Sequence, residues 1–357
     1  MIRIDEIYNN VFLLKILTKT RQSMHCFYPF GRTDYPSLHV HPLINDRDNT
    51  FLMWDQEPYF PEIHNTTIQS FVHDFIYPST SIPPSRRVGV PVSKCTFVTS
   101  EKNSKNVDDM CERNEFTQSY YFFHGWASLD WFRGYNRTFL IKDYKERSIT
   151  NTFILPNRIV SGKRKHRIAL FDKLVQDNSI KDNIVSFPKN CPYNNQEINI
   201  DNIKLPLTFK NENANNIPNE SYKISLWNQA KNSLVYVVTE TVYKEKTLHL
   251  TEKTFKPIVM QLPFILVAPK YSLEYLRSYG FKTFNEFWNE DYDLQDNNER
   301  MDSIAKLIKD LNVLSLKEKA QLQKHISPIV EHNFNWFYSD KFENLLWNEL
   351  TTMMKQW

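Results

Sequence analysis

Alternation of short apolar runs with helical patterns in the second half of the chain constrains its fold more than any other sequence feature. Apolar runs predict buried strands at residues 153–155, 184–187, 234–238, 264–267 and 281–284. Apolar side chains at helical spacing predict helices over residues 165–175, 226–232, 272–279, 298–311 and 316–326, with a further helix ending near Leu262. Gly280 suits the left-handed position that follows a helix. Strands that alternate with helices predict an α/β fold with a parallel sheet.

The first half of the chain is less regular, and the length of 357 residues suits two domains better than one. Buried strands are predicted there at residues 11–17, 51–54, 96–99 and 120–123. A polar, basic segment at 142–152 is the predicted linker. We therefore expect domains at residues 1–150 and 151–330. The aromatic-rich tail 335–357 is predicted to be helical and, within a final segment 331–357, to pack on the N-terminal domain.

Composition gives little support to a nucleic-acid-binding, zinc-binding or membrane-spanning protein. The net charge of +3 tolerates an anionic ligand but lacks the strong basic excess of nucleic-acid-binding domains. Four cysteines without a CxxC pair give little support to a zinc site, and either free thiols or two disulfides are compatible with their spacing. No apolar run approaches the about 20 residues that span a membrane, and no secretory leader is recognisable. We expect a cytoplasmic protein, of the producing or a host cell.

The strongest chemical signal follows the strand predicted at 234–238. Glu240 ends this strand, a polar loop follows, and Thr251-Glu252-Lys253 opens a helix. Helix N-termini favour phosphate groups, Lys253 adds positive charge, and Glu252 is able to accept hydrogen bonds from a ribose diol. Thr251 and Thr254 are alternative N-caps, because a cap at Thr251 places a proline inside the helix. The alternative interpretation is a charged, solvated loop.

A basic cluster follows the strand at 153–155. Asn157 and Arg158 come first, and then Lys163, Arg164, Lys165, His166 and Arg167 lead into the next predicted helix. Basic side chains at a strand-to-helix junction suit a pyrophosphate. A solvated basic surface would show the same pattern.

Three candidate general bases lie in the first half. Asp55 and Glu57 follow the strand at 51–54, where apolar neighbours would raise a carboxyl pKa toward the working range. His124 follows the apolar run at 120–123 and stands beside Trp126. Helix caps, ion pairs or a buried structural histidine would equally account for these residues.

Asp291-Tyr292-Asp293 matches the DxD pattern that binds divalent metals in one class of glycosyltransferase. Because these residues precede a predicted helix and do not end a buried strand, we interpret them as a capping loop and expect neither a metal nor a cofactor. No GxGxxG, P-loop, GxSxG or HExxH motif is present. The sequence therefore gives no motif support for a dinucleotide oxidoreductase, an ATPase or a common hydrolase.

Over residues 153–290 the chain resembles the alpha-1,3-fucosyltransferase family and, more broadly, GT-B glycosyltransferases of bacteria, large DNA viruses and phages. The resemblance rests on Glu240, on Thr251-Glu252-Lys253 and on Leu262-Pro263-Phe264-Ile265. It implies that Glu252 contacts the donor ribose, that Lys253 contacts a donor phosphate and that Glu240 lies near the donor. It also implies a pyrophosphate contact from one of three residues, Arg158, Lys165 or Arg167. In the first half only the turn around Glu57 matches, and there the family carries its proposed base.

The resemblance implies two Rossmann-like domains facing a cleft, with a C-terminal helix that crosses back to the first domain. We expect metal-independent, inverting transfer of a sugar from a nucleoside diphosphate sugar to a hydroxyl of a glycan or other acceptor, with Glu57 or His124 as base. Two alternatives remain. One is a phage-type glycosyltransferase that acts on hydroxylated bases in DNA. The other is a carbohydrate-binding protein without catalysis.

Overall fold

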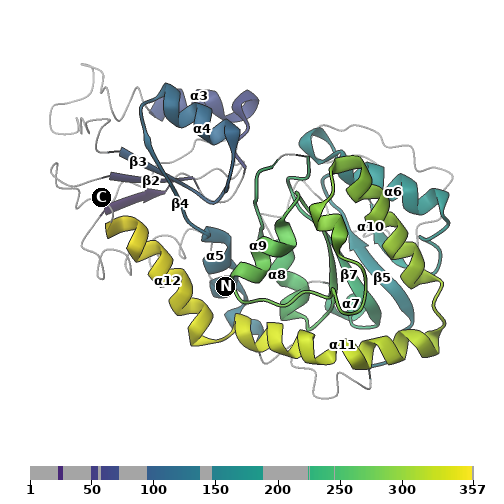
Figure 1. The fold of residues 1–357 in the computed structure, drawn as a ribbon. Helices are drawn as coiled ribbons and strands as arrows, with labels where there is room; N and C mark the ends of the chain where they lie inside the picture. Colours follow the sequence, from purple (N-terminus) through teal and green to yellow (C-terminus); the bar gives the residue numbers. More distant parts are fainter. Residues whose placement is uncertain are drawn as a thin grey trace, which may run out of the picture. The chain divides into compact units, whose positions relative to one another are not determined.

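The computed structural model describes residues 23–26, 50–54, 58–71, 95–136, 147–187, 224, 226–244 and 246–355 (Figure 1). The chain divides into two compact units. Unit 1 comprises Met1–Asp130 and Asn344–Trp357, and unit 2 comprises Trp131–Glu343. The division passes through helix α5 (Phe123–Phe132) and helix α12 (Asp340–Lys355). Within the described residues, no helix is both long and apolar enough to cross a membrane.

Unit 1 is built on a four-stranded parallel sheet. Its strands are β1 (Ser23–Cys26), β2 (Thr50–Trp54), β3 (Cys95–Thr99) and β4 (Thr117–Tyr120), and they lie in this order. Helices α3 (Pro61–Phe71) and α4 (Lys105–Arg113) connect them. The strands predicted at 51–54 and 96–99 are confirmed, and the run at 11–17 lies outside the described residues.

The strand predicted at 120–123 is wrong for most of its length. Tyr120 ends β4, the N–H of Tyr121 bonds to the carbonyl of Thr99 at 2.9 Å, and α5 begins at Phe123. Residues 121–123 are fully buried, and a short apolar run has the same signature in a buried strand and at the start of a buried helix.

The chain end packs in unit 1 through aromatic side chains. The rings of Trp126 on α5 and Trp347 on α12 lie 4.7 Å apart, edge to face. The predicted helix at 335–357 is two helices, because α11 (Leu316–Phe337) ends before Tyr338 and α12 begins at Asp340. Tyr338 and Ser339 separate them, and the hydroxyl of Ser339 accepts the N–H of Phe342 at 3.2 Å.

Unit 2 holds a second parallel sheet, which confirms the predicted α/β class. Its strands are β5 (Asn151–Pro156), β6 (Ile184–Ser186), β7 (Ser233–Thr239) and β8 (Phe264–Val267), in the spatial order β6-β5-β7-β8. The linker predicted at 142–152 ends sooner, since Asn151 and Thr152 belong to β5. Residues 281–284 form no strand. Phe281 and Phe284 fill the core instead, with their rings 5.7 Å from Phe255 and 5.2 Å from Phe264.

Helices cover both faces of this sheet. Helices α6 (His166–Gln176) and α10 (Asn297–Asn312) lie on one side, and α8 (Glu252–Val259) and α9 (Ser272–Ser278) on the other (Figure 1). The short helix α7 (Trp227–Ala230) precedes β7. The helices predicted from apolar spacing are confirmed here, although α11 continues well beyond residue 326. Gly280 follows α9 with φ of +89°, as predicted for a helix end.

The two ends of unit 2 differ from the boundaries near 150 and 330 that the sequence suggested. Residues 131–136 and 331–343 belong to unit 2 because they pack on each other. The ring of Phe132 lies 6.5 Å from that of Phe337, and the hydroxyl of Tyr338 donates to the carbonyl of Phe132 at 2.8 Å.

Candidate ligand site at the switch point of the second sheet

The switch point of the second sheet lies between β5 and β7. The chain adds β6 on one side of β5 and then returns to add β7 and β8 on the other side, with all four strands parallel. In open α/β sheets, ligands bind at the carboxyl ends of the strands at such a switch point. Asn157 follows β5 there, and Thr239 ends β7. The hydroxyl of Thr239 donates to Oδ1 of Asn157 at 2.7 Å and so bridges the two strands.

Asn157 has an unsatisfied donor at this point. The residue is 4% exposed, its N–H bonds to the carbonyl of Ser186 at 2.8 Å, and its Oδ1 is occupied by Thr239. Its side-chain Nδ2 is buried without a hydrogen-bond partner among the described residues. An unmade hydrogen bond of this kind costs about 1–3 kcal/mol, so the site gains from a ligand that brings an acceptor.

Glu240, directly after β7, holds the start of helix α8. Its carboxylate is fully buried and accepts from the N–H of Thr251 at 2.9 Å and from the hydroxyls of Thr251 and Thr254, each at 2.7 Å. Both carboxylate oxygens are therefore engaged within the protein. Glu240 acts as a positioning residue that fixes the N-terminus of α8 at the carboxyl edge of the sheet.

Thr251 is the N-cap of α8, which settles the choice between Thr251 and Thr254. Its backbone is extended, and its hydroxyl accepts the N–H of Lys253 at 3.3 Å. Pro257 consequently lies inside the helix. The missing backbone donor removes one bond from a helix that packing holds in place. Phe255 is fully buried, and its ring lies 5.3 Å from that of Phe337 on α11.

Lys253 presents a cation at this helix start. Its ammonium lies 3.0 Å from the hydroxyl of Thr251, 3.2 Å from Oε1 of Glu252 and 3.5 Å from the hydroxyl of Thr241. The Lys253 side chain is 32% exposed, whereas that of Glu252 is 10% exposed. A positive charge, the positive end of a helix and a neighbouring carboxylate together suit a ligand with phosphate and hydroxyl groups.

Arg167 is placed differently from the expectation that it contacts a pyrophosphate. Its guanidinium is 4% exposed and donates to the backbone carbonyls of Ile159 at 2.7 Å, Thr239 at 2.8 Å and Glu240 at 3.1 Å. Arg167 therefore ties α6 to the end of β7. Lys165 is exposed and Arg158 is half-buried, so these two residues keep the accessibility that a contact with a ligand requires.

His166 also supports the site from within. Its Nε2 lies 3.0 Å from the carbonyl oxygen of Glu240, and its ring stacks on Tyr243 at 5.1 Å. Burial, with the nearby Arg167 charge, lowers the pKa of His166 to about 3. Tyr243 is fixed in turn by Arg300, which lies 4.4 Å from its ring centroid. The loop between β7 and α8 is thus anchored to α6 and α10.

Of the three candidate bases in unit 1, His124 is the one that the structure describes. Asp55 and Glu57 lie outside the described residues. His124 is 1% exposed on α5, where its ring lies 6.2 Å from that of Phe123. A side chain buried to this degree has no surface from which to approach an acceptor hydroxyl, so its environment is that of a structural histidine.

Glu101 is a positioning residue that the sequence reasoning missed. It follows β3 and is 3% exposed. Its carboxylate accepts from the N–H of Tyr59 at 2.5 Å and from the hydroxyl of Ser104, the N-cap of α4, at 2.9 Å. Glu101 therefore repeats in unit 1 the arrangement of Glu240 in unit 2. The available signal was a glutamate soon after an apolar strand, with a helix-capping serine three residues later.

Asp291 and Asp293 lie in a short segment in which Asp293 has a capping role, as predicted, but Asp293 caps a different helix. Asp293 accepts the N–H groups of Leu273 at 2.9 Å and Glu274 at 3.1 Å, in the first turn of α9. Both of its oxygens are thus used, and burial raises its pKa. Across the described part of the chain, no group of three or more His, Cys, Asp or Glu side chains is placed to hold a metal.

Comparison with known proteins adds no further evidence on function. No protein-family model matches the chain. No curated protein matches it significantly, and no solved structure does so.

Proposed function

We propose that this chain is a glycosyltransferase that binds the nucleoside diphosphate of a sugar donor at the switch point of unit 2. The observation that carries this proposal is the buried, unpartnered Nδ2 of Asn157, at the same sheet edge as the α8 N-terminus with its half-buried Lys253. A diphosphate supplies an oxygen acceptor for this Nδ2 and further negative charge for the Lys253 ammonium and the helix N-terminus. In this proposal unit 2 is the donor domain of a GT-B enzyme and unit 1 is the acceptor domain.

The proposed chemistry is inverting transfer. A carboxylate, Glu57 by the sequence resemblance, takes the proton of an acceptor hydroxyl whose oxygen attacks the anomeric carbon of the donor. The bond between that carbon and the diphosphate oxygen breaks, and the nucleoside diphosphate leaves. Lys253 and the N-terminus of α8 stabilise the charge that develops on the leaving group. Glu252 accepts hydrogen bonds from the ribose hydroxyls.

A thermal-shift panel with GDP, UDP, ADP, CDP and CMP, each with and without EDTA, tests the donor site. A nucleotide at one hundred times its dissociation constant stabilises the protein by about 2.7 kcal/mol. We expect one diphosphate to stabilise the protein equally in both conditions, and that nucleotide names the donor base. Stabilisation that EDTA abolishes would contradict a metal-independent site, and no shift with any nucleotide would contradict the donor site itself.

Two substitutions locate the binding to the switch point. Lys253→Ala removes a charged hydrogen-bond donor to phosphate, which we expect to weaken nucleotide binding about 10–100-fold. Asn157→Asp keeps the acceptor for Thr239 but replaces the free donor with a negative oxygen, so it should weaken binding at least tenfold. Lys324→Ala, at an exposed position of α11, is the matched control. Unchanged nucleotide affinity in both site variants would place the donor elsewhere.

A further inference from the structure

Tyr271 combines an exposed aromatic ring with a strained backbone at the carboxyl edge of the second sheet. It lies in the loop between β8 and α9. The residue is 45% exposed and is the one aromatic among the large apolar side chains that are exposed in the described ranges. Its φ of +69° is left-handed, a region that residues with a Cβ rarely adopt. Residues in such conformations cluster at ligand sites.

Backbone hydrogen bonds hold Tyr271 in this conformation. Its N–H donates to the carbonyl of Asp293 at 2.8 Å, and its carbonyl accepts the N–H of Tyr275 at 2.9 Å. The next residue, Ser272, donates from its N–H to the carbonyl of Pro269 at 3.3 Å. A strained conformation persists only where the surrounding structure over-determines it. The position of Tyr271 is therefore built into the loop.

The other end of α9 meets the same backbone requirement without a side chain. Gly280 follows the helix with φ of +89°, and glycine adopts this region without strain. At the start of the helix the chain instead places a large ring that remains exposed to water. A ring that stays exposed contributes little to stability by burial. We therefore expect the strain at Tyr271 to be offset by a contact with a ligand.

A neighbouring cation covers one face of the ring. The ammonium of Lys270 lies over the ring of Tyr271, 5.4 Å from its centroid, which is a cation–π distance. The same ammonium lies 3.4 Å from Oδ1 of Asp296, the N-cap residue of α10. Lys270 thus steadies the ring from one side, and a planar ligand is able to stack on the other.

The loop that carries Tyr271 adjoins the candidate donor site. β8 pairs with β7, and the N–H of Glu240 donates to the carbonyl of Val267 at 3.0 Å where these strands end. Asn297 begins α10, and its Nδ2 donates to the carbonyl of Lys244 in the β7–α8 loop at 3.0 Å. Neighbouring strands lie about 4.8 Å apart. Tyr271 therefore lies at the same edge of the sheet as the N-terminus of α8, one strand away.

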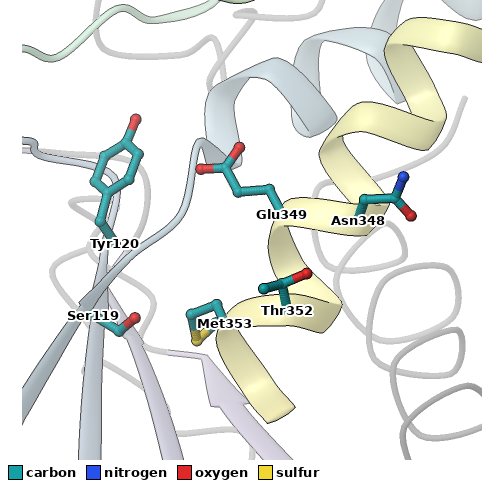
Figure 2. A pocket seen from close by; sticks show the side chains of 6 residues that line it. All are labelled: Ser119, Tyr120, Asn348, Glu349, Thr352 and Met353. Atoms are coloured by element: carbon teal, nitrogen blue, oxygen red, sulfur yellow. The ribbon is translucent and has the colours of Figure 1, made fainter. Parts of the chain in front are cut away.

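An open hollow in unit 1, between β4 and α12, is less suited to a nucleotide (Figure 2). Its volume is about 490 Å³, and the lining that the described residues provide is mostly apolar. These residues are Ser119, Tyr120, Asn348, Glu349, Thr352 and Met353. None of the six is basic, so they supply no cation for a phosphate. This difference favours unit 2 as the part of the chain that binds the whole nucleotide.

We infer that the nucleobase of the donor stacks on Tyr271. This inference rests on the proposed donor site and extends it to the part of the nucleotide that Asn157 and Lys253 do not recognise. The base lies against the face of the ring opposite Lys270, while the diphosphate binds at the start of α8. Every base has a π face, so this contact contributes affinity and does not select among bases.

Titration calorimetry of the full chain with GDP, UDP, ADP and CDP tests this inference. Tyr271→Gly removes the ring and relieves the backbone strain. We expect it to weaken binding of the nucleotide that the wild type prefers about 5–100-fold, as for the loss of one stacked base. Its melting temperature should equal or exceed that of the wild type, because glycine suits this φ. Tyr271→Phe keeps the ring and should bind within about twofold of the wild type.

Ligand-observed NMR identifies the part of the nucleotide that loses contact. Saturation transfer to the base protons, relative to the ribose H1′, should fall in Tyr271→Gly and persist in Tyr271→Phe. Leu316→Ala, at an exposed apolar position of α11, is the control and should change neither measurement.

Three results would overturn the inference and leave the donor site intact: unchanged affinity in Tyr271→Gly, an equal loss of affinity in Tyr271→Phe, or a Tyr271→Gly protein that melts several degrees below the wild type. The last result would show that the ring acts through packing. If the wild type binds none of the four nucleotides, the donor site fails and the stacking contact fails with it.

Discussion

Replacement of Glu240 by glutamine tests how the candidate donor site is held together. The buried carboxylate accepts three hydrogen bonds at the start of α8, two at 2.7 Å and one at 2.9 Å. Glu240→Gln keeps the side-chain shape but removes the charge. Hydrogen bonds to charged groups contribute about 1.5–3 kcal/mol, and neutral ones about 0.5–1.5 kcal/mol. Each bond therefore loses about 1 kcal/mol, and the three together lose about 3 kcal/mol. Removal of the negative charge near the N-terminus of α8 acts in the same direction.

Differential scanning calorimetry measures this loss. For a unit of this size, 1 kcal/mol corresponds to about 2–4 °C in melting temperature, so we expect Glu240→Gln to melt about 6–12 °C below the wild type. Glu331→Gln makes the same chemical change on the exposed surface of α11, and its melting temperature should move by less than about 2 °C. If both variants melt within about 2 °C of the wild type, the carboxylate charge does not hold α8, and the assignment of Glu240 as its anchor is wrong.

Two further changes probe other parts of unit 2. Burial lowers the pKa of His166 from its ordinary value of 6.5 to about 3, so its contribution to stability is full above about pH 6.5 and falls as the pH drops toward 3. At pH 5 the expected loss is about 2 kcal/mol, and His166→Gln should remove that part of the pH dependence of stability in urea denaturation. An unchanged pH dependence in this variant would contradict a buried neutral imidazole. At Gly280, φ is +89° and an added Cβ would lie 2.5 Å from the Trp336 ring, so Gly280→Ala should destabilise the protein by about 3 kcal/mol. The control is Gly134→Ala, where an added Cβ meets nothing within 4 Å, and it should change stability by less than about 0.5 kcal/mol. Equal effects of the two substitutions on the free energy of unfolding would refute the steric argument.

Local sequence pattern was sufficient for much of the second sheet. The run Leu234-Val235-Tyr236-Val237-Val238 is apolar throughout because β7 is covered on both faces, and such strands carry a clear signal. Gly280 was recognisable as a helix end because few other residues adopt its backbone conformation. Asp293 was correctly assigned to a capping role, but the helix predicted to follow it is not the one it caps, since it accepts from the first turn of α9, which precedes it in the chain.

The parts that escaped prediction depend on contacts between distant residues. Arg167 was predicted to bind phosphate, but its Nη1 and Nη2 groups donate to the carbonyls of Ile159, Thr239 and Glu240, which only the packed chain brings together. Glu101 was overlooked because its partner Tyr59 is 42 residues away in the sequence. A charge in a sequence predicts that a partner exists, whereas the fold decides whether that partner is a ligand or the protein itself.

The placement of residues 344–355 has a consequence for synthesis of the chain. Unit 1 is interrupted by unit 2, and its last helical segment is translated only after all of unit 2. Domains generally fold as units during synthesis, and the N-terminal one usually completes first. Here the order of completion is reversed, because Trp126 must wait for Trp347 to leave the ribosome. Until then the Trp126 side chain on α5 lacks its aromatic partner from α12, so we expect the nascent chain to be most exposed to aggregation in this interval.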